Sequence, residues 1–87
     1  MLGVVDTIDV GAGPAGLTVS PNGTRVYVAN ALDGTVSVIN TATLGVTATI
    51  PVDEIPLGVA FNPGGTRAYV NNAESGTLSV ITPPPTR

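Results

Sequence analysis

The sequence contains no cysteine, no histidine, no lysine and no tryptophan. Without cysteine, no disulfide can support the fold, and no redox compartment is implied. Without cysteine and histidine, the chain also lacks a zinc-ligand set and the base of a Ser/His/Asp triad. These absences predict a non-enzymatic protein with no catalytic residues and no cofactor.

Charged and aromatic residues are scarce as well. Three arginines stand against six acidic residues, which gives a net charge of −3. Nucleic acids require a basic face for their phosphates, and single strands also require aromatic rings for base stacking. Two tyrosines and one phenylalanine are too few for that purpose. The composition therefore argues against a nucleic-acid partner.

Long apolar runs are missing from the sequence. No stretch is long enough to span a membrane, and the N-terminus lacks the basic segment and apolar run of a signal peptide. We expect no membrane insertion, and the cellular location stays open because an exported parent could have lost its signal. Apolar residues still make up 43% of the chain and charged residues only 10%. This balance predicts that some apolar surface is buried against other copies.

A ten-residue phrase organises the chain and occurs twice, at 21–30 and at 63–72. Each copy reads as a tight turn, with proline first and glycine third, followed by a β-strand. When the chain is shifted over itself by 42 residues, 21 of 45 aligned pairs are identical. A repeat of this length is in the range of one propeller blade.

Short alternating or apolar segments between turn residues predict an all-β protein. The expected strands are 2–10, 17–20, 25–30, 35–40, 46–52, 57–61, 66–72 and 77–82. The strand 25–30 is apolar on both faces, which predicts cover from both sides. The glycines at 11–16 have the spacing of a dinucleotide-binding fingerprint, but they lead into a strand rather than a helix. We therefore discard that interpretation.

The strands at 27–30 (YVAN) and 69–72 (YVNN), together with the turns before them, resemble the YVTN family of β-propeller repeats. Both copies depart from the threonine of that motif, with Ala29 and Asn71 in its place. The resemblance implies a ring of four-stranded antiparallel blades, commonly in secreted or cell-surface proteins. It carries over no catalytic residue, because the motif is structural. We interpret the two tyrosines as packing residues whose hydroxyls are hydrogen-bonded near the sheet edge.

The order of the strands predicts a single two-blade unit over 1–87. Repeat 1 spans about 11–52, repeat 2 spans about 53–82, and the proline-rich tail at 83–87 ends the fold. Repeat 2 has only three strands, whereas the strand 2–10 has no blade of its own. We expect this strand to complete repeat 2 of a neighbouring copy. The residues of this clasp are Val4, Ile8, Val10 and Val80.

Identical two-blade chains can cover each other's open sheets head to tail, because each chain then buries the face that its neighbour leaves exposed. Such a contact closes into a ring when the rotation per copy fits. The blade count is then even, and common propeller sizes allow six blades from a trimer or eight from a tetramer.

Acidic and basic residues fall at opposite ends of the expected strands. The acidic set comprises Asp33, Asp53, Glu54 and Glu74, and the basic set comprises Arg25, Arg67 and Arg87. Oxygen-rich loops suit hard cations, so the acidic set is a candidate metal site. The chain has no Asp-x-Asp calcium loop, however. The sequence therefore favours the alternative that these charges keep an apolar ring soluble, with no metal bound.

Three functions remain open at this stage. The sequence favours a self-assembling propeller that serves as a structural or binding scaffold. A carbohydrate or small-ligand binding ring is an alternative, although sugar sites usually stack on aromatic rings that are scarce here. A fragment or engineered piece of a larger surface-layer-like or lactonase-like propeller is another, and the lack of histidine argues against lactonase activity. The ligand is unknown.

Overall fold

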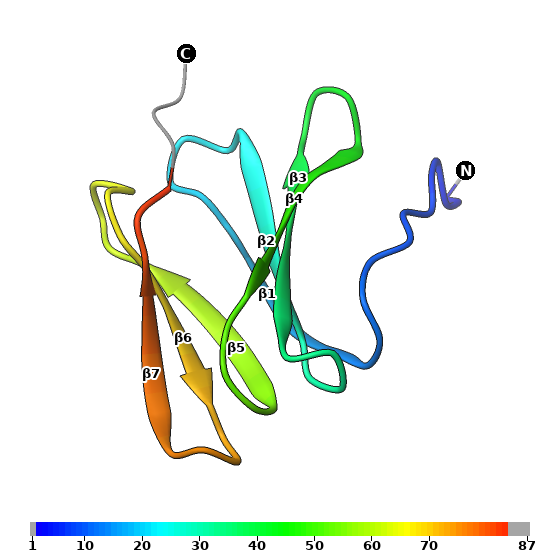
Figure 1. Cartoon of the computed structure of the whole chain (residues 1–87). Coiled ribbons are helices and arrows are strands. Elements are labelled where there is room, and N and C mark those ends of the chain that lie inside the picture. Colours follow the sequence, from blue (N-terminus) through cyan, green and yellow to red (C-terminus); the bar gives the residue numbers. More distant parts are fainter. Residues whose placement is uncertain (1, 84–87) are drawn as a thin grey trace.

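The computed structural model describes residues 2–83, which form seven β-strands and no helix. The strands are β1 (Pro14–Val19), β2 (Arg25–Asn30), β3 (Thr35–Asn40), β4 (Gly45–Pro51), β5 (Pro56–Phe61), β6 (Ala68–Asn72) and β7 (Thr77–Ile81) (Figure 1). None of the described residues lies in a helix that could cross a membrane. The all-β fold expected from the sequence is confirmed.

The strands form two antiparallel sheets in which each strand pairs with the next in the chain. Sheet A has the order β1-β2-β3-β4, and sheet B has the order β5-β6-β7. Within the described residues, the division into one four-stranded and one three-stranded repeat agrees with the sequence. The strand bounds differ by a few residues: β1 begins at Pro14 rather than at 17, and β6 begins at Ala68 rather than at 66.

The hairpin turns before β2 and β6 have the geometry that the repeated phrase predicts. Gly23 and Gly65 lie in the left-handed region, with φ of 76° and 72°. Glycine adopts this conformation without the steric cost that a Cβ brings. The amide groups of both glycines donate to a backbone carbonyl three residues earlier, at 2.8 Å for Gly23 and 3.0 Å for Gly65. The local sequence thus fixes both turns.

The segment 2–10 does not form the strand that its alternating pattern predicts. Within residues 2–83 it belongs to neither sheet, and most of its side chains are exposed. Figure 1 shows it leaving β1 and running on the side of sheet A that faces away from sheet B. Alternation favours a strand only where the segment can pair with the edge of a sheet, and this segment pairs with neither sheet, although β4 and β7 are edge strands within the described residues.

The core lies between the two sheets. The face of sheet A that carries Tyr27 packs on sheet B. In each sheet we call the face that carries the repeated tyrosine, Tyr27 or Tyr69, the tyrosine face, and we call the opposite face the reverse face. Residues that are paired in an antiparallel ladder point to the same face of the sheet, so the register shows on which face each core residue lies. From sheet A the core contains Tyr27, Val36, Val38 and Ile50, and from sheet B it contains Val59, Phe61, Ala68, Val70 and Ile81.

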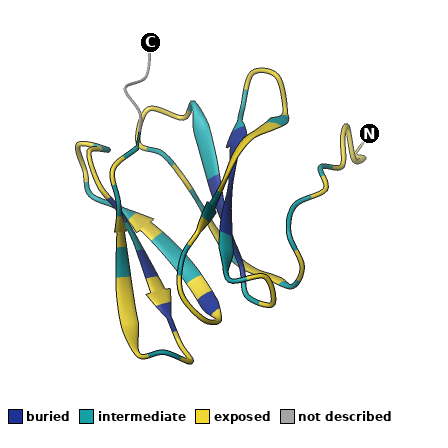
Figure 2. Cartoon of the chain, viewed as in Figure 1, coloured by how far each residue is buried: buried dark blue, intermediate teal, exposed yellow. Residues whose placement is uncertain are grey.

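Apolar residues on the same two kinds of face are exposed on the outside of the chain, although Val28 and Ile39 on the reverse face of sheet A are buried. The tyrosine face of sheet B exposes Leu78 (59%) and Val80 (57%), whereas their repeat equivalents Val36 (0%) and Val38 (4%) are buried. The reverse face of sheet A likewise exposes Leu17 and Val19. Figure 2 shows this contrast as buried positions in β2, β3 and β6 beside exposed positions along β7. Only one of the two repeats therefore has its tyrosine face covered.

The sheets approach most closely at Gly16. A Cβ at this position would run into the carbonyl oxygen of Leu57 and would lie 3.3 Å from the Cα of Gly58. This contact brings β1 against β5. Glycine is required here because the backbone of the second sheet occupies the space that a side chain would need.

We predict that Gly16→Ala lowers the free energy of unfolding by about 1–3 kcal/mol, since the two sheets must separate to admit the methyl group. Urea denaturation followed by circular dichroism measures this loss. Gly64→Ala is the matched control, because nothing lies within 4 Å of a Cβ built there and its φ is not positive. Equal losses for the two variants would contradict the close approach at Gly16.

Candidate functional site

The loops gather at two ends of the sheets, and the charges divide between them (Figure 1). The loops β2–β3, β4–β5 and β6–β7 share one end and carry Asp33, Asp53, Glu54 and Glu74. Arg25 begins β2 and Arg67 precedes β6, so both lie at the other end. The structure therefore places each described member of the two charged sets on the end that the sequence assigned to it. Arg87 lies outside the described residues.

The acidic end does not gather its carboxylates into a metal site. Asp33 accepts a hydrogen bond from the Ala12 amide at 2.8 Å, and Asp53 accepts one from the Thr77 hydroxyl at 3.0 Å. Asp33, Asp53 and Glu54 line a shallow hollow of about 320 Å³. In residues 2–83 no three acidic side chains are close enough to hold a metal ion together. Asp33 and Asp53 instead hold neighbouring loop residues.

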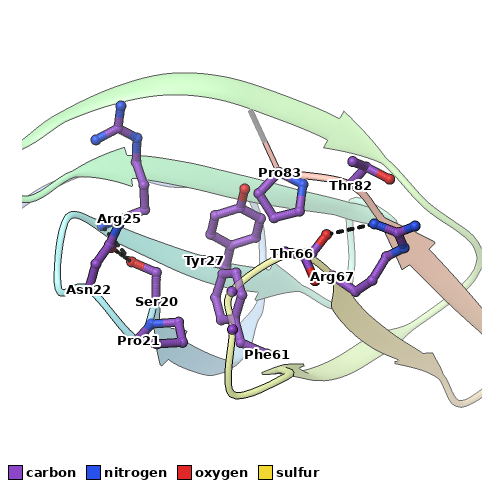
Figure 3. Close-up of a pocket in the computed structure, with 12 residues that line it drawn as sticks. Ser20, Pro21, Asn22, Arg25, Tyr27, Phe61, Thr66, Arg67, Thr82 and Pro83 are labelled. Carbon is purple, nitrogen blue, oxygen red and sulfur yellow. Dashed lines mark hydrogen bonds between the residues drawn. The ribbon is translucent and has the colours of Figure 1, made fainter. Parts of the chain in front are cut away.

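The arginine end holds the larger pocket, which lies between the hairpins β1–β2 and β5–β6. Its volume is about 660 Å³. It is lined by Ser20, Pro21, Asn22, Arg25, Tyr27, Phe61, Gly64, Gly65, Thr66, Arg67, Thr82 and Pro83 (Figure 3). Both copies of the repeated phrase therefore contribute to one concave surface, and the floor comes from the aromatic part of the core.

Tyr27 forms that floor together with Phe61. The two rings meet edge to face, with centroids 4.9 Å apart and planes at 77°. Tyr27 is 1% exposed, which confirms it as a packing residue. Its hydroxyl, however, has no hydrogen-bond partner among the described residues, so the expected bond near the sheet edge is wrong. The turn residues that surround the ring at this end use their own polar groups to hold the hairpin.

The electrostatic environment of Tyr27 has two opposing parts. Burial raises the pKa of the Tyr27 hydroxyl, because the ionised form loses solvation, and the nearby Arg25 charge lowers that pKa by a smaller amount. The Arg25 guanidinium donates to the Thr24 carbonyl at 3.0 Å, and the Arg67 guanidinium donates to the Thr66 carbonyl at 2.9 Å. No acidic residue lines the pocket.

Two buried asparagines hold the other end of β2 and β6. Asn30 donates to the hydroxyls of Thr35 and Ser37, and Asn72 donates to those of Thr77 and Ser79 in the same way. These bonds tie each asparagine to the strand that follows it. Asn30 also accepts from the Gly11 amide at 3.2 Å, whereas the Asn72 side-chain oxygen has no partner among the described residues.

The expected clasp residues are not brought together within one chain. Val4 is exposed, Ile8 and Val10 are half-buried, and Val80 is exposed on β7. The segment 2–10 lies on the far side of sheet A from sheet B (Figure 1). Any contact between this segment and β7 would therefore join two chains.

Sequence reasoning missed the pocket at the arginine end. The usable signal was the dipeptide Thr-Arg that follows each Pro-x-Gly turn, at 24–25 and 66–67. A repeated arginine beside a repeated tyrosine indicates that the two blades place the same groups at the same end. That these groups share one pocket depends on how closely the hairpins approach across the sheets.

The chain is similar to a solved structure of hydrazine synthase from Kuenenia stuttgartiensis, with a TM-score of 0.80 and 29% sequence identity over 94% of this chain and 23% of that one. It also shares its fold with a functionally unknown protein from Desulfotomaculum acetoxidans, with a TM-score of 0.67 and 22% identity over 83% of this chain and 27% of that one. No protein-family model and no curated protein sequence matches it. The chain thus spans about a quarter of the length of either solved chain.

We predict that Tyr27 makes the fold sensitive to alkaline pH. A raised pKa in the folded state means that the unfolded chain loses its proton first, so stability is complete below the ordinary value of about 10 and falls as the pH rises through the folded value. Urea unfolding between about pH 8 and about pH 11 measures the loss. Tyr27→Phe should show a smaller loss over the same range, and an identical loss would contradict the assignment.

Proposed function

We propose that the chain is a two-blade propeller unit that assembles with copies of itself into a closed ring and serves as a structural or binding scaffold. One observation carries the proposal. The tyrosine face is buried in sheet A and open in sheet B, whereas the reverse face is buried in sheet B and exposes Leu17 and Val19 along β1 of sheet A. The exposed apolar residues thus lie on the same two kinds of face as those that already pack together inside the chain.

We call the packing of a tyrosine face on a reverse face a joint. The joint between sheets A and B inside one chain is the model for the joint that we propose between copies. Shifting the internal joint by one repeat places Tyr69, Leu78 and Val80 of one copy against Leu17 and Val19 of the next. Burying a large apolar side chain contributes roughly 1.5–3 kcal/mol. Asn71 takes the place of Ala29 on this face, so assembly buries an amide that needs a hydrogen-bond partner in the neighbouring copy.

Gly58 supports the same arrangement. Its repeat equivalent Gly16 is required because the backbone at 57–58 approaches it, but nothing in the single chain makes a similar demand at Gly58. The nearest atom to a Cβ built there is the side-chain oxygen of Asn71, at 3.2 Å. In the proposed ring, the backbone at 15–16 of the next copy approaches Gly58.

The segment 2–10 then supplies the missing fourth strand of sheet B in the adjacent copy. In sheet A, β4 pairs with β3 so that Ala48 lies opposite Val38 and Ile50 lies opposite Val36. The same register, shifted by 42 residues, pairs Asp6 with Val80 and Ile8 with Leu78. A bulge in the β3–β4 ladder puts Val46 opposite Ile39, on the reverse face. Val4 is the repeat equivalent of Val46. In the proposed pairing it therefore lies on the reverse face, whereas in a regular strand it would share a face with Ile8.

Three chains give a six-bladed ring and four give an eight-bladed ring. A fragment of a longer propeller obeys the same packing rule, with adjacent blades supplied by the parent chain instead of by copies. The likeness to hydrazine synthase covers 23% of that chain, so its activity is no guide to this one. Our proposal stays non-enzymatic because the sequence has no histidine or cysteine and its carboxylates hold loops.

A sugar-binding ring is less well supported. Tyr27 is 1% exposed and packs its ring on Phe61, so it presents no open face for stacking. Light scattering at micromolar concentration tests the scaffold proposal directly. A mass of three or four times 8.6 kDa is expected, and a stable folded monomer would contradict it.

We predict that Gly58→Ala weakens assembly but leaves the single chain folded. The added methyl group meets only the mobile Asn71 side chain within one copy, whereas in the ring it meets a neighbouring backbone. Each joint should lose about 1–3 kcal/mol, or roughly 5- to 100-fold in affinity. Analytical ultracentrifugation gives the affinity, and circular dichroism gives the fold. A ring as tight as that of the unchanged protein would count against the joint.

We predict that the double variant Ile8→Cys with Leu78→Cys forms disulfides between copies. The proposed register puts these residues directly opposite each other, within the range that a disulfide spans. The chain has no other cysteine, so non-reducing electrophoresis shows dimers and larger covalent species. Ile8→Cys with Val80→Cys is the control, being two residues out of register. Equal cross-linking of both variants, or none of either, would refute the clasp.

A further inference from the structure

The pocket at the arginine end carries positive charge, and none of the described residues that line it is acidic. Arg25 and Arg67 both line it, and each uses one donor on the carbonyl of the residue before it. A guanidinium has five donors in a planar fork, so most of them stay available in both side chains. The described acidic residues of the folded loops are all at the opposite end of the sheets, where the hollow with Asp33 and Asp53 lies.

The Tyr27 hydroxyl is a second, independent sign of a ligand. The side chain is 99% buried, it lines this pocket, and its hydroxyl has no partner among the described residues. A buried hydroxyl without a partner is costly and rare, because burial has removed its bonds to water. Figure 3 shows the hydroxyl directed away from Phe61, toward Pro83 at the rim.

We propose that this pocket binds a small organic carboxylate with an apolar or aromatic body. The carboxylate accepts hydrogen bonds from the Arg25 guanidinium and the Tyr27 hydroxyl, while Arg67, on the other side of Tyr27 (Figure 3), adds positive charge at the opposite wall. The apolar body lies against Phe61 and Pro21. Because the hydroxyl oxygen is itself buried, the bound carboxylate displaces the part of the wall that covers it.

Three properties of the site select this class of ligand. The planar fork of arginine matches a carboxylate with two parallel hydrogen bonds. The volume of about 660 Å³ falls in the range of small-molecule pockets. The walls add an aromatic ring and two prolines, which a free inorganic anion would leave unused. All the residues belong to one chain, so the site does not depend on assembly into a ring.

Benzoate is the probe for this site, titrated into the full chain by calorimetry near neutral pH. In parallel, NMR follows the side-chain N–H signals of the arginines. Saturable binding that shifts the Arg25 signals is expected. Arg25→Gln should weaken binding by about 10-fold or more, and Arg67→Gln should weaken it less, because only its charge acts. Arg25→Lys should lie between the unchanged chain and Arg25→Gln, since it keeps the charge but loses the fork.

Tyr27→Phe separates a binding role from a structural one. It keeps the ring contact with Phe61 and removes only the hydroxyl, so benzoate affinity should fall several-fold while resistance to urea stays the same or rises. Asp53→Asn, at the opposite end, is the control and should bind as the unchanged chain does.

Several outcomes would overturn the proposal. No saturation at tens of millimolar benzoate excludes the site. Binding that survives both arginine-to-glutamine changes places benzoate elsewhere. Equal affinity for inorganic phosphate at matched ionic strength shows a general anion patch rather than a carboxylate site. The mass from light scattering tests the ring separately. If the scaffold proposal fails, the benzoate titration can still be interpreted.

Discussion

The packing of a tyrosine face on a reverse face is the contact on which the rest of the structure depends. It creates the main apolar core of the described residues, from side chains of six strands, including the edge-to-face pair Tyr27 and Phe61. Because both faces recur in each repeat, one joint leaves exposed apolar residues of each kind: Leu78 and Val80 on the tyrosine face of sheet B, and Leu17 and Val19 on the reverse face of sheet A. In the proposed ring, the same kind of interaction would hold the copies together.

The two repeats have diverged where their surroundings differ. Position 19 is valine in the first repeat and its equivalent is Phe61 in the second, so only the internal joint has an aromatic pair. Ala29 is fully buried, whereas its equivalent Asn71 is exposed. The internal joint is therefore the more apolar one. The joint that we propose between copies would have fewer apolar contacts and one more amide.

The charged ends have different consequences for chemistry. At the acidic end, Asp33 and Asp53 accept hydrogen bonds that fix neighbouring loops, which is sufficient reason for their presence. At the arginine end, Arg25 and Arg67 bond only to adjacent carbonyls, and a buried hydroxyl lies between their hairpins without a partner. Folding alone does not account for that arrangement. The unsatisfied hydroxyl near Arg25 is the reason that we propose a ligand at this end.

The sequence by itself determined the strands, their order and the hairpin turns, because these follow from a period of two, from glycine at Gly23 and Gly65, and from a 42-residue repeat. It also placed the charges at their ends. Only the tertiary structure decided that residues 2–10 lack a partner within the chain and that the Tyr27 hydroxyl is unsatisfied. The reason is physical: alternation and turn preference act between neighbours in the chain, whereas burial and hydrogen-bond supply depend on which surfaces meet across the sheets.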